Sequence, residues 1–246
     1  MIAYLNLRHN VGERVAAFEA GLRRHGYRVE QGVPKRPPGD ADLFVSWNRL
    51  HIANTAAAMY EQHGCQVLIA ENAAWGNNFA GGNWLSLALN YHNQQGRTPV
   101  GGPERWDSLG VEPAPFRQSG ETVILPQRGI GPAATRMPTG WPTQAQERHG
   151  GRIRPHPGMS RAKPLEDDLA RCGKVVTWGS GAAVKALLWG IPVVSEMPNW
   201  IAQQDNSESG RLAMLRRLAW ANWRLEEIAS GDAFAHLLHG EVQREQ

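Results

Sequence analysis

The stretch Lys174–Val194, KVVTWGSGAAVKALLWGIPVV, constrains the fold more than any other part of the 246-residue chain. It begins with a β-branched run, turns at Gly179–Gly181, and continues in strong helix formers over Ala182–Trp189. Gly190 ends this helix, and Ile191–Val194 returns to a strand pattern. The order predicts one right-handed βαβ unit. The loop after its first strand would lie where open α/β sheets bind ligands, and amides at a helix N-terminus suit an anion.

The first 75 residues alternate strand and helix patterns that are joined by short loops. The strand patterns cover residues 1–7, 27–30, 42–47 and 66–70, and the amphipathic helix patterns cover residues 11–25 and 52–63. Such alternation is typical of a parallel sheet with helices on both faces.

A second series of strands begins at residues 121–125 and continues at 152–154 before it reaches the βαβ stretch. Residues 98–120 are rich in proline and glycine and predict an interdomain or lid segment, whereas 210–238 predict one or two C-terminal helices. We therefore expect an α/β fold made of two small Rossmann-type parallel-sheet halves that face a cleft. The expected halves are residues 1–118 and 119–246.

Three loops of the second half follow predicted strands, and such loops meet at one edge of a parallel sheet. They combine arginines, a histidine, a serine hydroxyl and glycine amides, an inventory that suits a diphosphate. Neither the P-loop nor the dinucleotide fingerprint is present. Each loop alone could be an ordinary tight turn. Together they predict an anion site formed by Gln127, Arg128, Gly129, Gly131, Arg154, His156, Trp178, Gly179, Ser180, Gly181 and Ala182.

The segment Glu71–Gly96, ENAAWGNNFAGGNWLSLALNYHNQQG, predicts a functional loop at the end of the fourth strand. Its two tryptophans, six asparagines and four glycines make it too polar for a core and too aromatic for a linker. Glu71 is the best placed general base, with a loop cap as the alternative role. Residues that could bind a second substrate are Asn72, Trp75, Asn77, Asn78 and Trp84.

The charge distribution favours phosphate-bearing partners, although the formal net charge is only +3. Seven Lys or Arg residues stand against one acid between Arg128 and Lys163, and seven against three between Arg8 and Arg36. A solvated basic surface is the alternative. No apolar run reaches 18 residues, and the N-terminus lacks a signal-peptide pattern, so we expect no membrane insertion. Two distant cysteines without a CxxC pattern predict reduced thiols in the cytoplasm and no metal site.

The sequence TWGSGAAVKALLWGIPVV, preceded by RPHPG and PLEDDLA, resembles the nucleotide-binding half of GT-B glycosyltransferases. It is most similar to the capsule polysaccharide (Kdo-transferase-like) group and related phage-encoded DNA glycosyltransferases, over about 70 residues from Gln127 to Pro198. Lys185 replaces the glutamate that this group usually carries in the helix. The resemblance implies a GT-B-like fold, a nucleotide-sugar donor with UDP-sugars favoured, and no metal or other cofactor. The anion site would then be the donor site.

The resemblance leaves three functions open. Basicity and the aromatic, asparagine-rich loop favour a phage enzyme that acts in the host cytoplasm on 5-hydroxymethylcytosine or another 5-hydroxymethylpyrimidine in double-stranded DNA. The base would be flipped and stacked on the tryptophans. The alternative is a transferase for capsule or surface polysaccharide. The third option is a non-catalytic GT-B fold that only binds nucleotide or nucleic acid.

Overall fold

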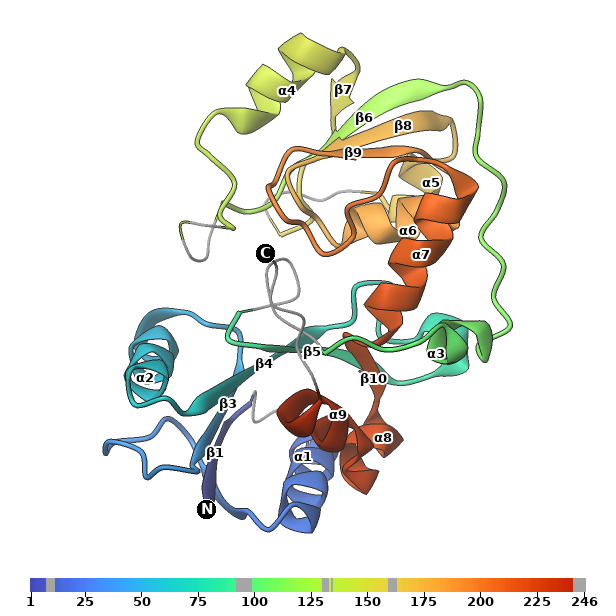
Figure 1. Ribbon diagram of the computed structural model, residues 1–246. Coiled ribbons are helices and arrows are strands. Elements are labelled where there is room, and N and C mark those ends of the chain that lie inside the picture. The colour runs from blue at the N-terminus through green and yellow to red at the C-terminus, as the bar shows by residue number, and fades with distance from the viewer. Residues whose placement is uncertain (8–11, 92–98, 130–132, 134, 159–162, 241–246) are drawn as a thin grey trace. The chain divides into compact units, whose positions relative to one another are not determined.

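The computed structural model describes all residues except 8–11, 92–98, 130–132, 134, 159–162 and 241–246. The chain forms two compact units, each built on one sheet (Figure 1). The first unit joins Met1–Arg105 to Arg216–Gln246, and the second is the continuous segment Trp106–Leu215. No helix in the described ranges is long and apolar enough to cross a membrane.

The first unit contains a six-stranded sheet with the order β10-β5-β4-β3-β1-β2. Its parallel part is formed by β1 (Ile2–Asn6), β2 (Arg28–Gln31), β3 (Leu43–Trp47) and β4 (Gln66–Asn72). Two antiparallel strands extend it on one side, β5 (Trp84–Leu89) and β10 (Asn222–Arg224). A short 3₁₀ turn, η1 (Phe79–Gly81), precedes β5.

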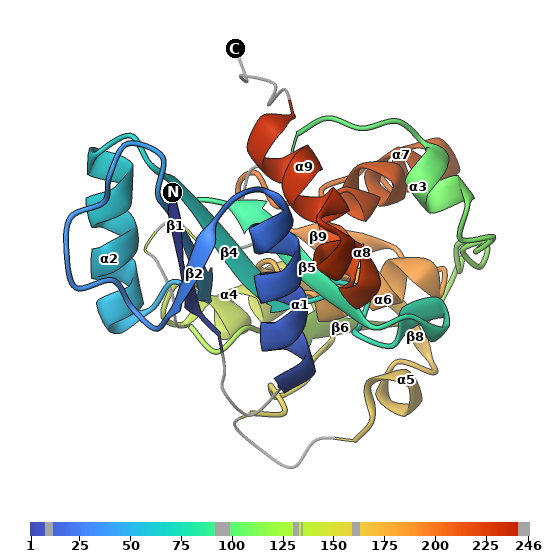
Figure 2. The ribbon, with the colours of Figure 1, turned by 90° about the horizontal axis from the view of Figure 1, so that it is seen from below.

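Helices cover both faces of this sheet because the side chains of its strands alternate between two cores. Leu5, Val45 and Leu68 pack with α1 (Gly12–Arg24), α8 (Leu225–Ser230) and α9 (Asp232–His239). Figure 2 shows these three helices side by side, with α2 (His51–Gln62) on the opposite side of the strands. Phe44 and Ile69 pack against the buried residues of α2.

The second unit contains a four-stranded parallel sheet with the order β7-β6-β8-β9. The strands are β6 (Glu121–Leu125), β7 (Arg152–Ile153), β8 (Cys172–Thr177) and β9 (Val193–Ser195). Its helices are α4 (Trp141–His149), α5 (Leu165–Asp168) and α6 (Ala182–Leu188). Two further helices lie across the unit boundaries, α3 (Glu104–Asp107) and α7 (Glu208–Ala219). The predicted βαβ unit is present as β8-α6-β9.

Three features differ from the expectation. The segment predicted as one functional loop contains the fully buried strand β5, and residues 210–238 contain the strand β10 besides helices. Helix α4 lies in a segment for which the sequence indicated no element. The expected boundary at residue 118 also differs from the observed division, because everything from Arg216 onward packs with the first unit.

Candidate functional site

The loops after β6 and β8 meet at the carboxyl edge of the second sheet. Gln127 Nε2 donates a hydrogen bond to the carbonyl oxygen of Gly179 (2.9 Å). The fully buried Thr177 donates through Oγ1 to the carbonyl oxygen of Leu125 (2.9 Å) and accepts from the Ser180 N–H (3.0 Å). The sheet edge therefore holds the glycine turn in a fixed position.

The Gly179–Ala182 turn offers fewer open amides than its sequence suggested. The Ser180 N–H is bonded to Thr177, and the Ala182 N–H donates to Ser180 Oγ (3.3 Å). The hydrogen bonds of the described residues leave the Gly181 N–H open. A Cβ atom on Gly179 would lie 3.0 Å from Met197 Sδ, so glycine lets the turn pack closely on the segment after β9.

Arg128 and His156 are brought together on this edge. A Cβ atom built on Gly158 would lie 3.3 Å from Arg128 Cδ and 3.1 Å from His156 Nδ1, which places all three residues within contact. The Gly158 N–H donates to His156 Nδ1 (2.9 Å), so the neutral imidazole carries its proton on Nε2. Burial, with added repulsion from Arg128 and Arg154, lowers the pKa of His156. The pair offers one cation and one neutral N–H donor.

Arg154 does not take the role expected of it. Its side chain is only 6% exposed, its Nε lies 2.6 Å from Asp168 Oδ2, and its Nη2 donates to the carbonyl oxygen of Lys163 (2.7 Å). These contacts tie the end of β7 to α5. Arg154 is therefore a buried structural cation rather than an open ligand for a phosphate.

Trp178 and the glycines of the loop after β6 complete the predicted set. Trp178 Nε1 donates to the carbonyl oxygen of Thr135 (3.0 Å), and its ring meets Trp141 edge to face (centroids 6.1 Å apart). Trp178 thus packs the loop against α4. Gly129 has φ +68°, a backbone conformation that favours glycine. Gly131 lies outside the described residues.

Glu196, which the sequence did not single out, joins the end of β9 to α4. Its carboxylate accepts from Trp141 Nε1 (2.7 Å), Arg148 Nη2 (2.5 Å) and His149 Nε2 (2.8 Å). Partial burial raises the pKa of Glu196, but the bonds from Arg148, His149 and Trp141 outweigh it and hold the pKa below its ordinary value. The ionised form is thus favoured in the folded state.

Glu196→Gln is expected to flatten the acid side of the stability profile. A carboxyl group with a depressed folded-state pKa stabilises the fold above its unfolded pKa, near 4.3, and loses this contribution as pH falls through the folded pKa. The wild type should therefore lose melting temperature between about pH 5 and pH 3 more steeply than the variant. Glu147→Gln, an exposed position on the same helix, is the control; equal slopes for all three proteins would contradict the prediction.

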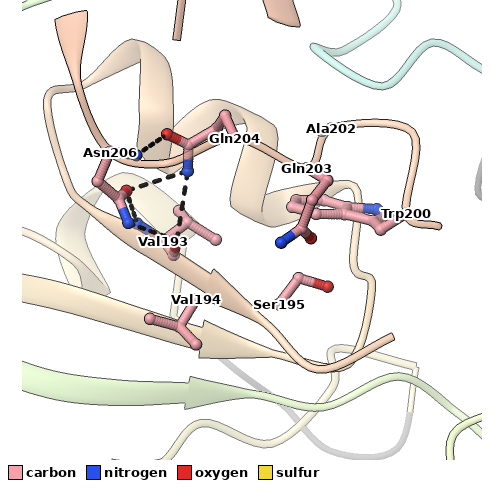
Figure 3. A pocket seen from close by; sticks show the side chains of 8 residues that line it. All are labelled: Val193, Val194, Ser195, Trp200, Ala202, Gln203, Gln204 and Asn206. Atoms are coloured by element: carbon pink, nitrogen blue, oxygen red, sulfur yellow. Dashed lines mark hydrogen bonds between the residues drawn. The ribbon is translucent and has the colours of Figure 1, made fainter. Parts of the chain in front are cut away.

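A small pocket opens beside β9 (Figure 3). Its volume is about 110 Å³. We call it the β9-edge pocket, lined by Val193, Val194, Ser195, Trp200, Ala202, Gln203, Gln204 and Asn206. Ser195 Oγ donates to the carbonyl oxygen of Trp178 (2.7 Å), which links the pocket to the loop after β8.

In the first unit, Glu71 lies near the carboxyl end of β4, beside the residue that follows β3. With the Asn48 amide oriented to satisfy both neighbours, its nitrogen donates to Glu71 Oε1 (3.0 Å) and its oxygen accepts from Trp47 Nε1 (3.0 Å). Asn48 has φ +67°, which asparagine tolerates well. Asn48 is a positioning residue that the sequence analysis missed; its signal was an asparagine directly after an apolar strand.

The predicted stacking surface is wrong for two of its members. Trp75 and Trp84 are 2% and 3% exposed and meet edge to face with centroids 5.3 Å apart, so they form core rather than a platform for a flipped base. Asn77 is also structural, because it accepts from the Ala73 N–H and donates to Asn72 Oδ1 (both 2.9 Å). Asn72 and Asn78 are exposed.

Among the described residues, no group of three or more His, Cys, Asp or Glu side chains could hold a metal ion. The sequence matches no family model and no curated protein. Among solved structures the chain is similar to Thermosulfurimonas dismutans KpsC, a beta Kdo 2,4 transferase, with a TM-score of 0.55 and 17% sequence identity. The match covers 90% of this chain and 90% of that chain. This likeness confirms the predicted α/β, GT-B-like fold class.

Proposed function

We propose that this protein is a glycosyltransferase that moves a sugar from a nucleotide-sugar donor to a hydroxyl group of a surface polysaccharide. The observation that carries the proposal is the likeness of fold, over 90% of both chains, to a beta Kdo 2,4 transferase. The meeting of Arg128 and His156 at the carboxyl edge of the second sheet supports it, since this edge is where open α/β sheets bind ligands.

The proposed reaction divides its roles between the two units. Arg128 and the Nε2–H of His156 would stabilise the negative charge that develops on the departing nucleotide phosphate, without a metal. The acceptor oxygen forms a bond to the anomeric carbon as the bond from that carbon to the phosphate oxygen breaks. Glu71 would take the proton that the acceptor hydroxyl loses. Asn48 would hold the carboxylate of Glu71 in the orientation that this step needs.

A saccharide acceptor is favoured over DNA. The DNA hypothesis rested on basic charge and on tryptophans that could stack on a flipped base, and Trp75 and Trp84 are buried. The solved structure that matches across both units is a polysaccharide-type sugar transferase by its title. Hydroxymethylcytosine DNA is therefore kept as a competing acceptor in the test.

The test is a panel of UDP-, GDP- and CMP-sugars, CMP-Kdo included, offered with a Kdo-terminated oligosaccharide or with hydroxymethylcytosine DNA. We expect a mass increase of one sugar on the oligosaccharide and release of the matching nucleotide. A mass shift only on the DNA nucleoside would replace the proposed acceptor. Nucleotide binding without transfer from any donor would support the non-catalytic alternative instead.

Arg128→Ala is expected to weaken binding of the donor nucleotide by about 10- to 100-fold, the usual cost of a lost hydrogen bond to a charged group. Arg128 is exposed and makes no ion pair within the described part of the chain, so its removal should leave the melting temperature unchanged. Titration calorimetry with UDP and CMP measures the effect. Arg136→Ala, a nearby exposed arginine, serves as control; equal affinities for both variants would exclude Arg128 from the donor site.

Asn48→Gly is expected to lower the transfer rate about tenfold, because the carboxylate of Glu71 loses its orienting partner. Glycine accepts the positive φ of this position, so the backbone should stay in place. Initial rates at saturating donor give the result. Asn90→Gly, with φ +69° in the wild type, is the matched control; a similar rate loss in both variants would assign the effect to the backbone.

A further inference from the structure

The β9-edge pocket lies at the free edge of the second sheet. Strand β9 pairs only with β8, so one side of its backbone faces away from the sheet. At Val193 the protein's own side chains cover this side. Asn206 Oδ1 accepts from the Val193 N–H (2.8 Å), and Asn206 Nδ2 donates to the Val193 carbonyl oxygen (3.0 Å). One planar amide therefore satisfies a donor and an acceptor of the same residue (Figure 3).

Ser195 presents the next donor and acceptor on the same side. In a parallel strand the N–H and C=O groups of alternate residues point the same way. The Glu196 N–H bonds to Thr177 O in β8, and so the N–H and C=O of Ser195 point outward, as those of Val193 do. Among the described residues no side chain pairs with these two groups as Asn206 pairs with Val193. They border the β9-edge pocket.

The other walls of the pocket suit a flat ring. Trp200 and Ala202 are buried and supply apolar surface, while Gln203 and Gln204 supply amides. Ligand pockets usually hold about 300 Å³ or more, so a volume of about 110 Å³ suits one ring rather than a whole ligand. A partner for Ser195 needs a hydrogen-bond donor next to an acceptor on one edge. Uracil and cytosine both have this pattern in a single ring.

We propose that the β9-edge pocket binds a pyrimidine base, whose edge pairs with the backbone N–H and C=O of Ser195. The ring takes the place at Ser195 that the Asn206 amide takes at Val193. The recognition depends on backbone groups at a sheet edge, and the sequence motifs of the loops do not reveal it.

The position of the pocket gives the base a direction relative to the phosphates; this step rests on the proposed function. Ser195 Oγ bonds to the carbonyl oxygen of Trp178, and a Cβ atom on Gly179 would lie 3.3 Å from Trp200 Cδ1. The pocket thus adjoins the turn after β8, whose Gly181 N–H is open. A pyrimidine nucleotide would lie with its base over β9 and its phosphates toward β8 and β6.

The test is amide NMR of the full chain with uridine 5′-monophosphate, cytidine 5′-monophosphate or adenosine 5′-monophosphate. We expect the two pyrimidine nucleotides to shift the Ser195 N–H resonance and slow its hydrogen exchange, and the purine nucleotide to bind more weakly. Binding of uridine 5′-monophosphate that leaves the Ser195 amide unchanged would overturn the proposal, as would equal effects of all three nucleotides.

A proline variant tests the backbone donor itself. Ser195→Pro removes the outward N–H, and edge strands tolerate proline at such positions. We expect about tenfold weaker binding of uridine 5′-monophosphate. Gln31→Pro is the matched control, because Gln31 is an outward position on the edge strand β2. Unchanged affinity in a folded Ser195→Pro variant contradicts the proposal; if that variant does not fold, the exchange measurement on the wild type decides.

The outcomes separate this proposal from the proposed function. Sugar transfer by a protein whose Ser195 amide ignores pyrimidine nucleotides would reject the pocket assignment alone. Protection of the Ser195 amide in a protein that transfers no sugar from any donor would reject the proposed function alone.

Discussion

Glu71→Gln is expected to lower the rate of sugar transfer by about 10²- to 10⁴-fold, the usual contribution of a general base. Glutamine keeps the shape of the side chain, and its carbonyl oxygen can still accept the bond from Asn48, but it cannot take a proton from the acceptor. Binding of the donor nucleotide should not change, because Glu71 belongs to the first unit and the predicted donor loops to the second. Initial rates and calorimetric affinities separate these two effects.

Glu112→Gln is the control for this substitution. Glu112 is an exposed carboxylate of the second unit, so its rate should equal that of the wild type. A Glu71→Gln variant that retains the wild-type rate would assign the proton transfer to another group. Loss of donor binding together with rate would instead indicate a folding defect, which circular dichroism would detect.

Phe234→Ala is expected to destabilise the protein by about 3–5 kcal/mol, the usual cost of truncating a buried phenylalanine. Phe234 on α9 is fully buried and meets Phe18 of α1 edge to face, with centroids 5.8 Å apart. The two helices approach so closely that a Cβ atom on Gly21 would collide with the Phe234 ring. The lost stability should be that of the first unit, to which both helices belong.

Urea denaturation followed by hydrogen exchange locates this loss. Amides of β1 and β3 should exchange faster in Phe234→Ala, since α9 packs on their core. Ile52→Ala, which shortens a side chain that is 70% exposed, should cost less than about 0.5 kcal/mol. A change below 1 kcal/mol in Phe234→Ala would argue against the packing of the C-terminal helices on α1.

The sequence predicts those elements whose pattern is local. The β8-α6-β9 unit follows from a β-branched run, a glycine turn and a block of helix formers, all within adjacent residues. The strands of the parallel part of the first sheet were likewise predicted within a few residues of their observed bounds. For such segments the local preference and the tertiary fold agree.

The missed strands depend on distant partners. Strand β5 (WLSLAL) is buried at every residue and lacks the alternation that marks a half-exposed strand, and the glycines and asparagines before it suggested a loop. Strand β10 has three residues and pairs with β5, more than 130 positions earlier in the chain. No local pattern reports such a pairing.

The candidate site shows the same limit. Sequence spacing correctly indicated that the loops after β6, β7 and β8 share one edge, because that follows from a parallel sheet. It could not show that Asp168 pairs with Arg154, or that Trp75 and Trp84 pack on each other. Residue type suggests a ligand contact, but only the packing shows whether a neighbour in the protein already occupies the side chain.

The first unit is discontinuous: the chain leaves it at Arg105 and returns at Arg216. During synthesis the second unit, being continuous, can finish folding before the first has all its parts. Until β10 leaves the ribosome, β5 remains an unpaired sheet edge, a surface that invites pairing with other chains. The half of the protein that is made first is thus completed last, and the nascent chain depends on its final thirty or so residues to close that edge.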